Sequence, residues 1–106
     1  MSGKTLLLNA LSSHQGREAG IAARDLAKQL EIPPRRLRTI VSECREEGLA
    51  ICGHPATGYF MATTPEELQQ TCAFLEHRAM HSLRKLSRMK KVSLPDLMGQ
   101  LMLNQA

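Results

Sequence analysis

Aromatic residues are scarce in this chain, which has no tryptophan, one tyrosine and two phenylalanines among 106 residues. Leucine, isoleucine, valine, methionine and alanine must therefore fill the core. A chain of this length favours a single domain, at most with an appendage, and it supports only a modest core. The three cysteines are odd in number and widely spaced, so they do not resemble a disulfide framework.

Long apolar runs are also lacking. No run approaches the roughly 20 residues of a membrane-spanning helix, and the first residues lack the apolar centre of a signal peptide. We therefore expect a cytoplasmic protein with reduced cysteines and no membrane partner. The sequence has no nucleotide-binding loop, no paired carboxylates in an apolar setting and no nucleophile–base pair, so we expect neither an enzyme nor a cofactor.

Histidine and cysteine give only a weak metal-binding pattern. Cys52, His54 and Cys72 could act with His77 and His81, which are four residues apart and would share one face of a helix. However, no second CxxC or HxxxH accompanies them, and Cys72 falls on an apolar stripe, where cysteine behaves as a small core residue. We expect no metal site.

Positive charge dominates, with a formal net charge of +4 and a pI near 9.3, which fits a nucleic-acid partner. Between residues 78 and 91 there is no acidic residue, and the six basic ones are Arg78, Arg84, Lys85, Arg88, Lys90 and Lys91. This run is a solvated helix face, a phosphate-contacting surface or a site for an acidic partner. Like charges at helical spacing destabilise a helix, which makes the first explanation less favourable. Arg84, Lys85 and Arg88 are the candidate residues for contact with phosphate or with an acidic partner.

Residues 32–48, IPPRRLRTIVSECREEG, predict an amphipathic helix over 34–47. Two prolines suit its start, and Gly48 suits a left-handed cap at its end. The spacing i, i+3, i+4, i+7 predicts one buried face, formed by Leu37, Ile40, Val41 and Cys44.

The exposed side of this predicted helix begins with arginine and ends with glutamate. Arg35, Arg36 and Arg38 lie in its first half, where a reading helix places side chains against base edges in the major groove. Arginine there can bind guanine or phosphate in a bidentate manner. Thr39 and Ser42 are secondary candidates. The alternative is a solvated face, because Glu43, Glu46 and Glu47 balance part of the charge.

Short elements surround the arginine-bearing helix. Residues 4–14 predict a first helix, and residues 20–30 predict a second one, with Leu26 and Ala27 facing inward. Glu31 and Ile32 then form a tight turn into the arginine-bearing helix. After Gly48, the runs 49–52 and 59–62 flank a loop rich in glycine and proline, which predicts a β-hairpin. His54 and Thr57 lie at its tip and either contact DNA or belong to a bare turn.

A long helix is predicted from Pro65 to about Val92. Thr64 suits its N-cap position, and Glu67 completes a capping box. Ser93 suits the cap of a last, amphipathic segment. Apolar residues recur along the long helix at spacings of three and four, which approaches a heptad seam and predicts a homodimer through the 65–92 helix: Leu68, Cys72, Leu75, Ala79, Leu83, Leu86 and Met89.

The run ARDLAKQLEIPPRRLRTIVSECREEGLAI, followed by the wing-like GHPATGYFMA, resembles a winged helix-turn-helix domain of the biotin-repressor type. The resemblance implies a mainly α fold with a small β-hairpin, formed by residues 1–64, and a helical, dimerising extension over 65–106. It implies sequence-specific binding of double-stranded DNA by a dimeric bacterial or phage transcriptional regulator. Because winged helices also dock proteins, an adaptor in a phage or plasmid replication assembly is the alternative.

Overall fold

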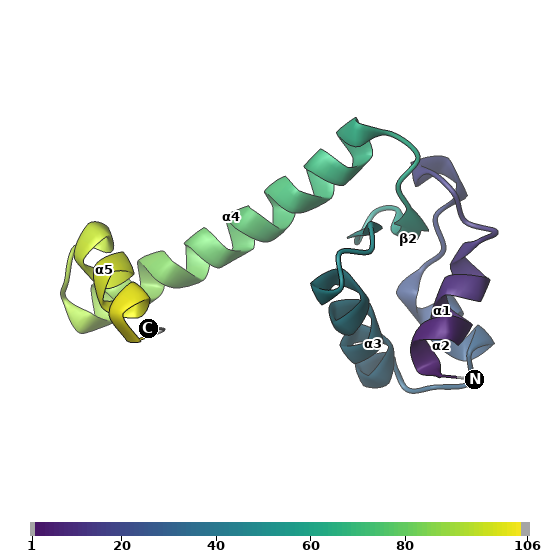
Figure 1. Cartoon of the computed structure of the whole chain (residues 1–106), viewed down its shortest axis with the longest axis horizontal. Coiled ribbons are helices and arrows are strands. Elements are labelled where there is room, and N and C mark those ends of the chain that lie inside the picture. Colours follow the sequence, from purple (N-terminus) through teal and green to yellow (C-terminus); the bar gives the residue numbers. More distant parts are fainter. Residues whose placement is uncertain (1, 105–106) are drawn as a thin grey trace. The chain divides into compact units, whose positions relative to one another are not determined.

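The computed structural model describes residues 2–104, and it confirms a mainly α fold with one small β-hairpin (Figure 1). The chain forms two compact units, Met1–Thr71 and Cys72–Ala106. Their boundary falls inside the long helix α4, seven residues after the boundary at 64/65 that the sequence suggested. The elements, in order, are α1 (Gly3–Leu11), η1 (Arg17–Ala19), α2 (Ala23–Gln29), α3 (Pro34–Glu46), β1 (Ile51–His54), β2 (Gly58–Met61), α4 (Pro65–Lys90) and α5 (Leu94–Asn104).

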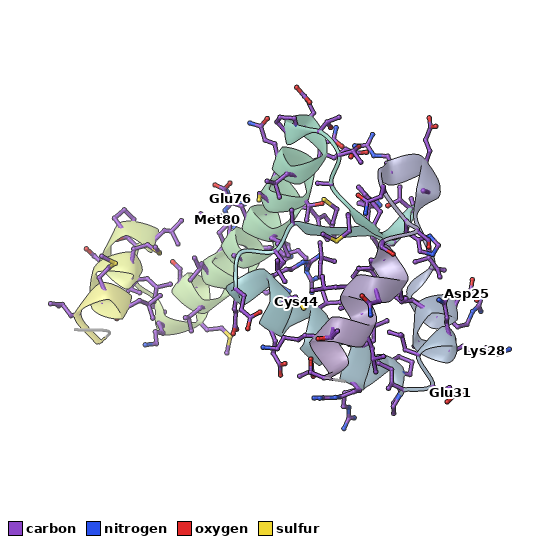
Figure 2. The ribbon with its side chains drawn as sticks, turned by 45° about the vertical axis from the view of Figure 1, so that its right-hand side comes forward. Asp25, Lys28, Glu31, Cys44, Glu76 and Met80 are labelled. Carbon is purple, nitrogen blue, oxygen red and sulfur yellow. The ribbon has the colours of Figure 1, made fainter. Side chains whose placement is uncertain are left out.

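The core of the first unit lies where α1 and α2 pack against α3. All four residues of the predicted inward face of α3 are buried, from Leu37 to Cys44, which confirms the stripe read from the sequence. Figure 2 shows Cys44 inside this unit, whereas Asp25, Lys28 and Glu31 point outward. The side chains that α1, α2 and β1 add to the core are Leu7, Leu11, Leu26, Ala27 and Ile51.

Hydroxyl side chains cap the starts of three helices. Ser2 accepts a hydrogen bond from the N–H of Thr5 at 3.2 Å at the start of α1. Thr64 accepts from the N–H of Glu67 at 3.2 Å, and Ser93 accepts from the N–H of Asp96 at 3.2 Å. The caps predicted for α4 and α5 are therefore confirmed. Each satisfies one of the donors that a helix start leaves unpaired.

Three helices end in the same hydrogen-bonding pattern, with a residue in the left-handed region. At the end of α3 this residue is Gly48 (φ 88°), as predicted, and Leu49 N–H donates to Cys44 O. At the ends of α2 and α4, the corresponding residues are Glu31 (φ 56°) and Lys91 (φ 56°). Both carry a side chain in a conformation that favours glycine, which makes these two turns strained relative to the turn at Gly48.

The hairpin pairs β1 with β2 in antiparallel register, from Ile51 opposite Met61 to His54 opposite Gly58. The first strand begins two residues later than the predicted run 49–52. The free edge of β2 is also paired, because Tyr59 exchanges backbone hydrogen bonds of 2.8 and 2.9 Å with Ile21. Further along, Gly16 donates to Met61 O and Met61 donates to His14 O. The loop between α1 and α2 thus acts as a third, irregular strand, which the sequence did not reveal.

The second unit contains most of α4 followed by α5, which folds back beside the end of α4 (Figure 1). Its turn is fixed by two hydrogen bonds, from Val92 N–H to Ser87 O at 3.1 Å and from Ser87 Oγ to Val92 O at 2.5 Å. Leu97 is its one fully buried hydrophobic side chain among the described residues. Large apolar side chains remain exposed on both helices, among them Leu75 (38%), Met89 (82%), Met102 (67%) and Leu103 (78%).

Candidate nucleic-acid interface

The three arginines at the start of α3 are exposed, and their guanidinium groups have no partner within the described part of the chain. The one ion pair found among residues 2–104 joins Lys4 to Glu47. Arg35, Arg36 and Arg38 are thus available to an external anion. The buried stripe of Leu37, Ile40, Val41 and Cys44 holds the helix backbone that presents them.

The start of α3 adds positive potential of its own. Pro33 and Pro34 supply no N–H and no side-chain cap, and the first turn contains no acidic residue. The first backbone bond of the helix runs from Leu37 N–H to Pro33 O at 3.1 Å, so the N–H groups of Arg35 and Arg36 have no acceptor within the described residues. A helix start of this kind attracts anions, because its unpaired N–H groups and the helix dipole both favour negative charge.

The outermost line of α3, opposite the buried stripe, runs through Arg35, Thr39, Ser42 and Glu46, which follow the spacing i, i+4, i+7, i+11. All four are exposed. Thr39 Oγ1 donates to Arg35 O at 3.2 Å, so its hydroxyl proton is used within the helix, whereas its oxygen can still accept. The line is therefore basic at its start, polar in the middle and acidic at its end.

Arg36 and Arg38 flank this line on opposite sides. Arg36 lies beside the start of α1, where a Cβ atom built on Gly3 would be 3.8 Å from Nη2 of Arg36. Arg38 lies on the same side of α3 as Arg45, seven residues later. Together with Arg35, they spread three guanidinium groups across the exposed half of the helix start.

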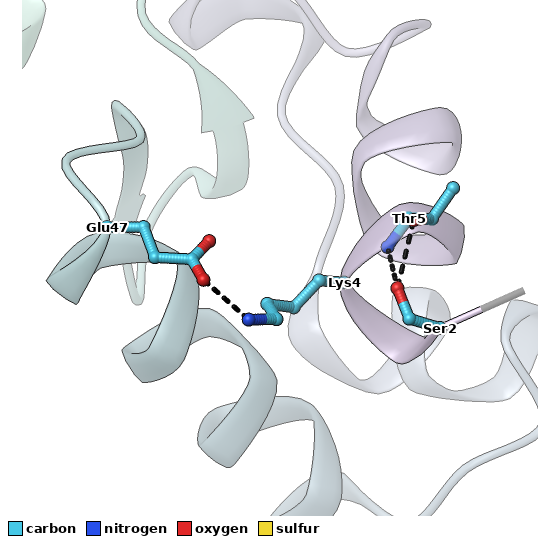
Figure 3. A network of polar contacts seen from close by, with 4 residues as sticks. All are labelled: Ser2, Lys4, Thr5 and Glu47. Carbon is cyan, nitrogen blue, oxygen red and sulfur yellow. Dashed lines mark hydrogen bonds and ion pairs between the residues drawn. The ribbon is translucent and has the colours of Figure 1, made fainter.

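The other end of α3 is occupied by internal contacts. Arg45 is partly buried and donates from Nε to Ile51 O at 2.9 Å, so it fastens α3 to β1 instead of facing solvent. Lys4 Nζ lies 2.5 Å from Glu47 Oε1. Figure 3 shows this ion pair between α1 and the end of α3. Glu47 raises the pKa of Lys4 through this hydrogen bond and its charge. Burial raises the pKa of the Cys44 thiol, as expected for a core cysteine.

The hairpin tip is shaped by its own hydrogen bonds. Thr57 N–H donates to His54 O at 3.0 Å, and Ala56 N–H donates to His54 Nδ1 at 3.1 Å. Thr57 Oγ1 donates to Gly58 O at 3.2 Å and is only partly exposed, whereas His54 is exposed. The structure therefore gives His54 and Thr57 roles in the turn itself. Whether they contact DNA as well stays a prediction.

Glu67 connects α4 to the loop between α1 and α2, a role that the sequence did not indicate. Its carboxylate accepts from the N–H and the hydroxyl of Thr63, each at 2.9 Å, and from the N–H of Arg17 at 2.7 Å. A capping box predicts that this carboxylate accepts from the N–H of the N-cap residue Thr64. It accepts instead from Thr63, one residue earlier. These bonds lower the pKa of Glu67, the Thr63 backbone bond contributing most and the Arg17 bond next.

The charges divide unevenly between the two units. Residues 1–71 contain eight basic and eight acidic residues, so their formal charges cancel. Residues 72–106 contain the other six basic residues and only two acidic ones, and they therefore carry the whole net charge of +4. Arg84, Lys85 and Arg88 are exposed on α4, and none of them has a partner in the described part of the chain.

Within residues 2–104, no group of three or more histidine, cysteine, aspartate or glutamate side chains is arranged to hold a metal ion. None of the helices described has the length together with the apolar character that crossing a bilayer requires. No family model, curated protein or solved structure matches this chain.

Proposed function

We propose that residues 1–64 form a winged helix-turn-helix domain that binds double-stranded DNA, with α3 in the major groove. The observation that carries the proposal is the start of α3. Three exposed arginines without internal partners surround a helix start that has no cap and no acidic residue. This combination suits phosphate oxygens and the guanine edge, both of which accept hydrogen bonds from arginine.

The order of elements supports the same proposal. Helices α2 and α3 are joined by a short turn, and the hairpin follows α3 after four residues. The buried stripe fixes the rotation of α3, so Arg35, Thr39 and Ser42 form its outermost line. In a helix-turn-helix protein, this line of the second helix faces the base edges. Glu46 lies at the far end of this line, nearest to the DNA backbone where it leaves the helix. Its negative charge would weaken binding.

We propose that the protein acts as a homodimer through α4, in the cytoplasm, as a transcriptional regulator. The second unit has 35 residues and one fully buried hydrophobic side chain among those described. A unit this small rarely holds its fold without additional support. The seam residues Leu68 and Leu75 are 41% and 38% exposed, and pairing with a second α4 would cover them.

DNA binding is tested with the full chain and duplex DNA of random sequence, by filter binding at low and raised salt. We expect a steep fall in affinity with salt, because several arginines release counterions from phosphate. The double variant Arg35→Ala/Arg36→Ala should bind more than about ten times more weakly. A control with the same loss of charge, Arg17→Ala/Lys90→Ala, should bind like the wild type within a factor of about two or three, since neither side chain lies on α3. Absence of binding at low salt would overturn the proposal.

The dimer is tested by sedimentation equilibrium of the full-length variant Leu75→Glu. A carboxylate in a helix–helix seam is buried without a partner, so the variant should sediment as a monomer. Gln70→Glu, an exposed change on the opposite side of α4, is the matched control and should remain dimeric. A monomeric wild type, or a dimeric Leu75→Glu variant, would reject pairing through this seam.

The balance of charge in the first unit favours one further candidate, a winged-helix adaptor that docks a protein in a phage or plasmid replication assembly. Residues 1–71 have no net charge, which is unusual for a domain that binds DNA by itself. The salt titration separates the two functions, because an adaptor has no affinity for random duplex DNA at low salt.

A further inference from the structure

We propose that one face of α4 is a second, sequence-independent binding site for the phosphate backbone of nucleic acid. This face is the basic stripe, formed by His77, Arg78, His81, Arg84, Lys85 and Arg88. The inference rests on the proposed function, and it deepens that function by separating the part of the protein that reads DNA from the part that supplies electrostatic affinity.

The continuity of α4 brings the stripe together. The helix is unbroken from Pro65 to Lys90, so residues that are three, four and seven apart share a face. All six members of the stripe are exposed. No acidic residue lies between His77 and Arg88, and Glu76, just before the stripe, shares its side of the helix with Met80 (Figure 2).

The stripe has few internal contacts. Arg78 lies over the ring of Phe74, with 5.9 Å between its Cζ atom and the ring centroid. None of the four cationic members forms an ion pair with a described residue. Like charges at three- and four-residue spacing destabilise a helix, so a stripe without compensating carboxylates costs stability in the free protein. An external polyanion would reverse that cost.

The distribution of charge points to phosphate as the ligand. Because the charges of residues 1–71 cancel, attraction of this chain to DNA over distances beyond direct contact must come mainly from residues 72–106. From His77 to Arg88 the helix rises about 16 Å. Over that length of its axis, one strand of B-DNA has about five phosphates but winds through about half a turn, so about two or three of them face a straight helix. A row of several cations therefore matches a row of several phosphates without any requirement for base sequence.

The test uses the full chain and measures the slope of log affinity against log salt on random-sequence duplex DNA. The stripe variant is Arg84→Gln/Lys85→Gln/Arg88→Gln. The scattered control removes the same charge away from the stripe, as Arg17→Gln/Lys28→Gln/Lys90→Gln. Because glutamine has nearly the helix propensity of lysine and arginine, circular dichroism should show unchanged helix content in both.

We expect the slope of the stripe variant to become shallower by about 0.9 for each phosphate contact removed, or about 2 to 3 for each chain. Its affinity at low salt should fall by at least tenfold, while the scattered control keeps a slope near that of the wild type. The sequences selected from a random DNA pool should be the same for wild type and stripe variant, because the stripe contacts no bases.

Two outcomes separate this inference from the proposed function. If wild type, stripe variant and control share one slope while Arg35→Ala/Arg36→Ala loses binding, the stripe is not a phosphate site and an acidic protein becomes its partner. If the stripe variant loses binding while Arg35→Ala/Arg36→Ala binds normally, the stripe is a phosphate-binding site. In that case α3 is not the helix that contacts the base edges. If the wild-type protein does not bind duplex DNA, both proposals fail.

Discussion

Four glycines allow a test of what the contact between the hairpin and the α1–α2 loop contributes to stability. Two causes favour glycine, a left-handed backbone and a close neighbouring atom, and each of the four has a different combination of them. Gly48 has a φ of +88° and would have no atom within 4 Å of an added Cβ. Gly20 has a φ of −58°, but its Cβ would lie 2.1 Å from Thr57 O. Gly58 has both features, with a φ of +75° and a Cβ position 2.2 Å from Ile21 O. Gly99 has neither.

Substitution of each glycine by alanine should therefore give four different changes in the free energy of unfolding. Gly48→Ala should cost about 1 kcal/mol, the cost of a side chain in the left-handed region. Gly20→Ala must push the β1–β2 hairpin away from the α1–α2 loop, and loss of the two bonds between Ile21 and Tyr59 should cost about 2 kcal/mol or more. Gly58→Ala combines both causes and should cost about 3 kcal/mol or more. Gly99→Ala, in the middle of α5, should stabilise its helix by about 0.5–1 kcal/mol.

The assay is urea unfolding of the full chain, followed by circular dichroism, with the midpoint and the slope fitted for each variant. The double variant Gly20→Ala/Gly58→Ala should cost less than the sum of its single changes, because both open the same contact. Equal costs for Gly48→Ala and Gly58→Ala would refute the argument. They would mean that the loop between α1 and α2 does not pair with β2, so that only the backbone conformation matters.

Three further changes test other parts of the fold. Glu31→Gly should stabilise the protein by about 1 kcal/mol in urea unfolding, because it removes a side chain from a left-handed position; a destabilised variant would contradict the strain assigned to that turn. Glu67→Gln should lower stability at pH 7 and lose its effect in acid. The pKa of Glu67 is lowered in the folded protein, so its contribution is present above the ordinary value of 4.5 and disappears as the pH falls through the folded pKa; a difference from wild type that persists unchanged to pH 2 would speak against these bonds. Glu46→Gln should tighten binding to random duplex DNA by a few fold without changing stability, since it removes a negative charge from the outermost line of α3; unchanged affinity would place that end of the helix away from the phosphates.

Local patterns in the sequence were sufficient for much of the fold. The four buried residues of α3, the left-handed Gly48 and the caps Thr64 and Ser93 were all predicted, and all are confirmed. Each depends on neighbours within about four residues, where periodicity and capping chemistry act directly. The hairpin was predicted as well, although its first strand begins two residues later than expected.

The candidate site was only partly visible in the sequence. The composition and spacing of α3 identified Arg35, Arg36 and Arg38, and the structure adds that they have no internal partner among the described residues. The same periodicity leaves Arg45 outside the buried stripe, yet its Nε donates to Ile51 O. No local pattern could show this contact, because the acceptor is a backbone oxygen that any residue type would supply.

The sequence by itself determined the end of α3 at Gly48, the starts of α4 and α5 at their caps, which side of α3 is buried, and which residues carry the excess of positive charge. These properties depend on the order of residue types along a helix. Only the tertiary structure decided that the loop between α1 and α2 pairs with β2, that Glu67 joins α4 to that loop, and that Gly20 and Gly58 are required by close contact. Backbone pairing between distant segments produces no periodic pattern of residue types in the sequence, because almost every residue supplies the same backbone donor and acceptor.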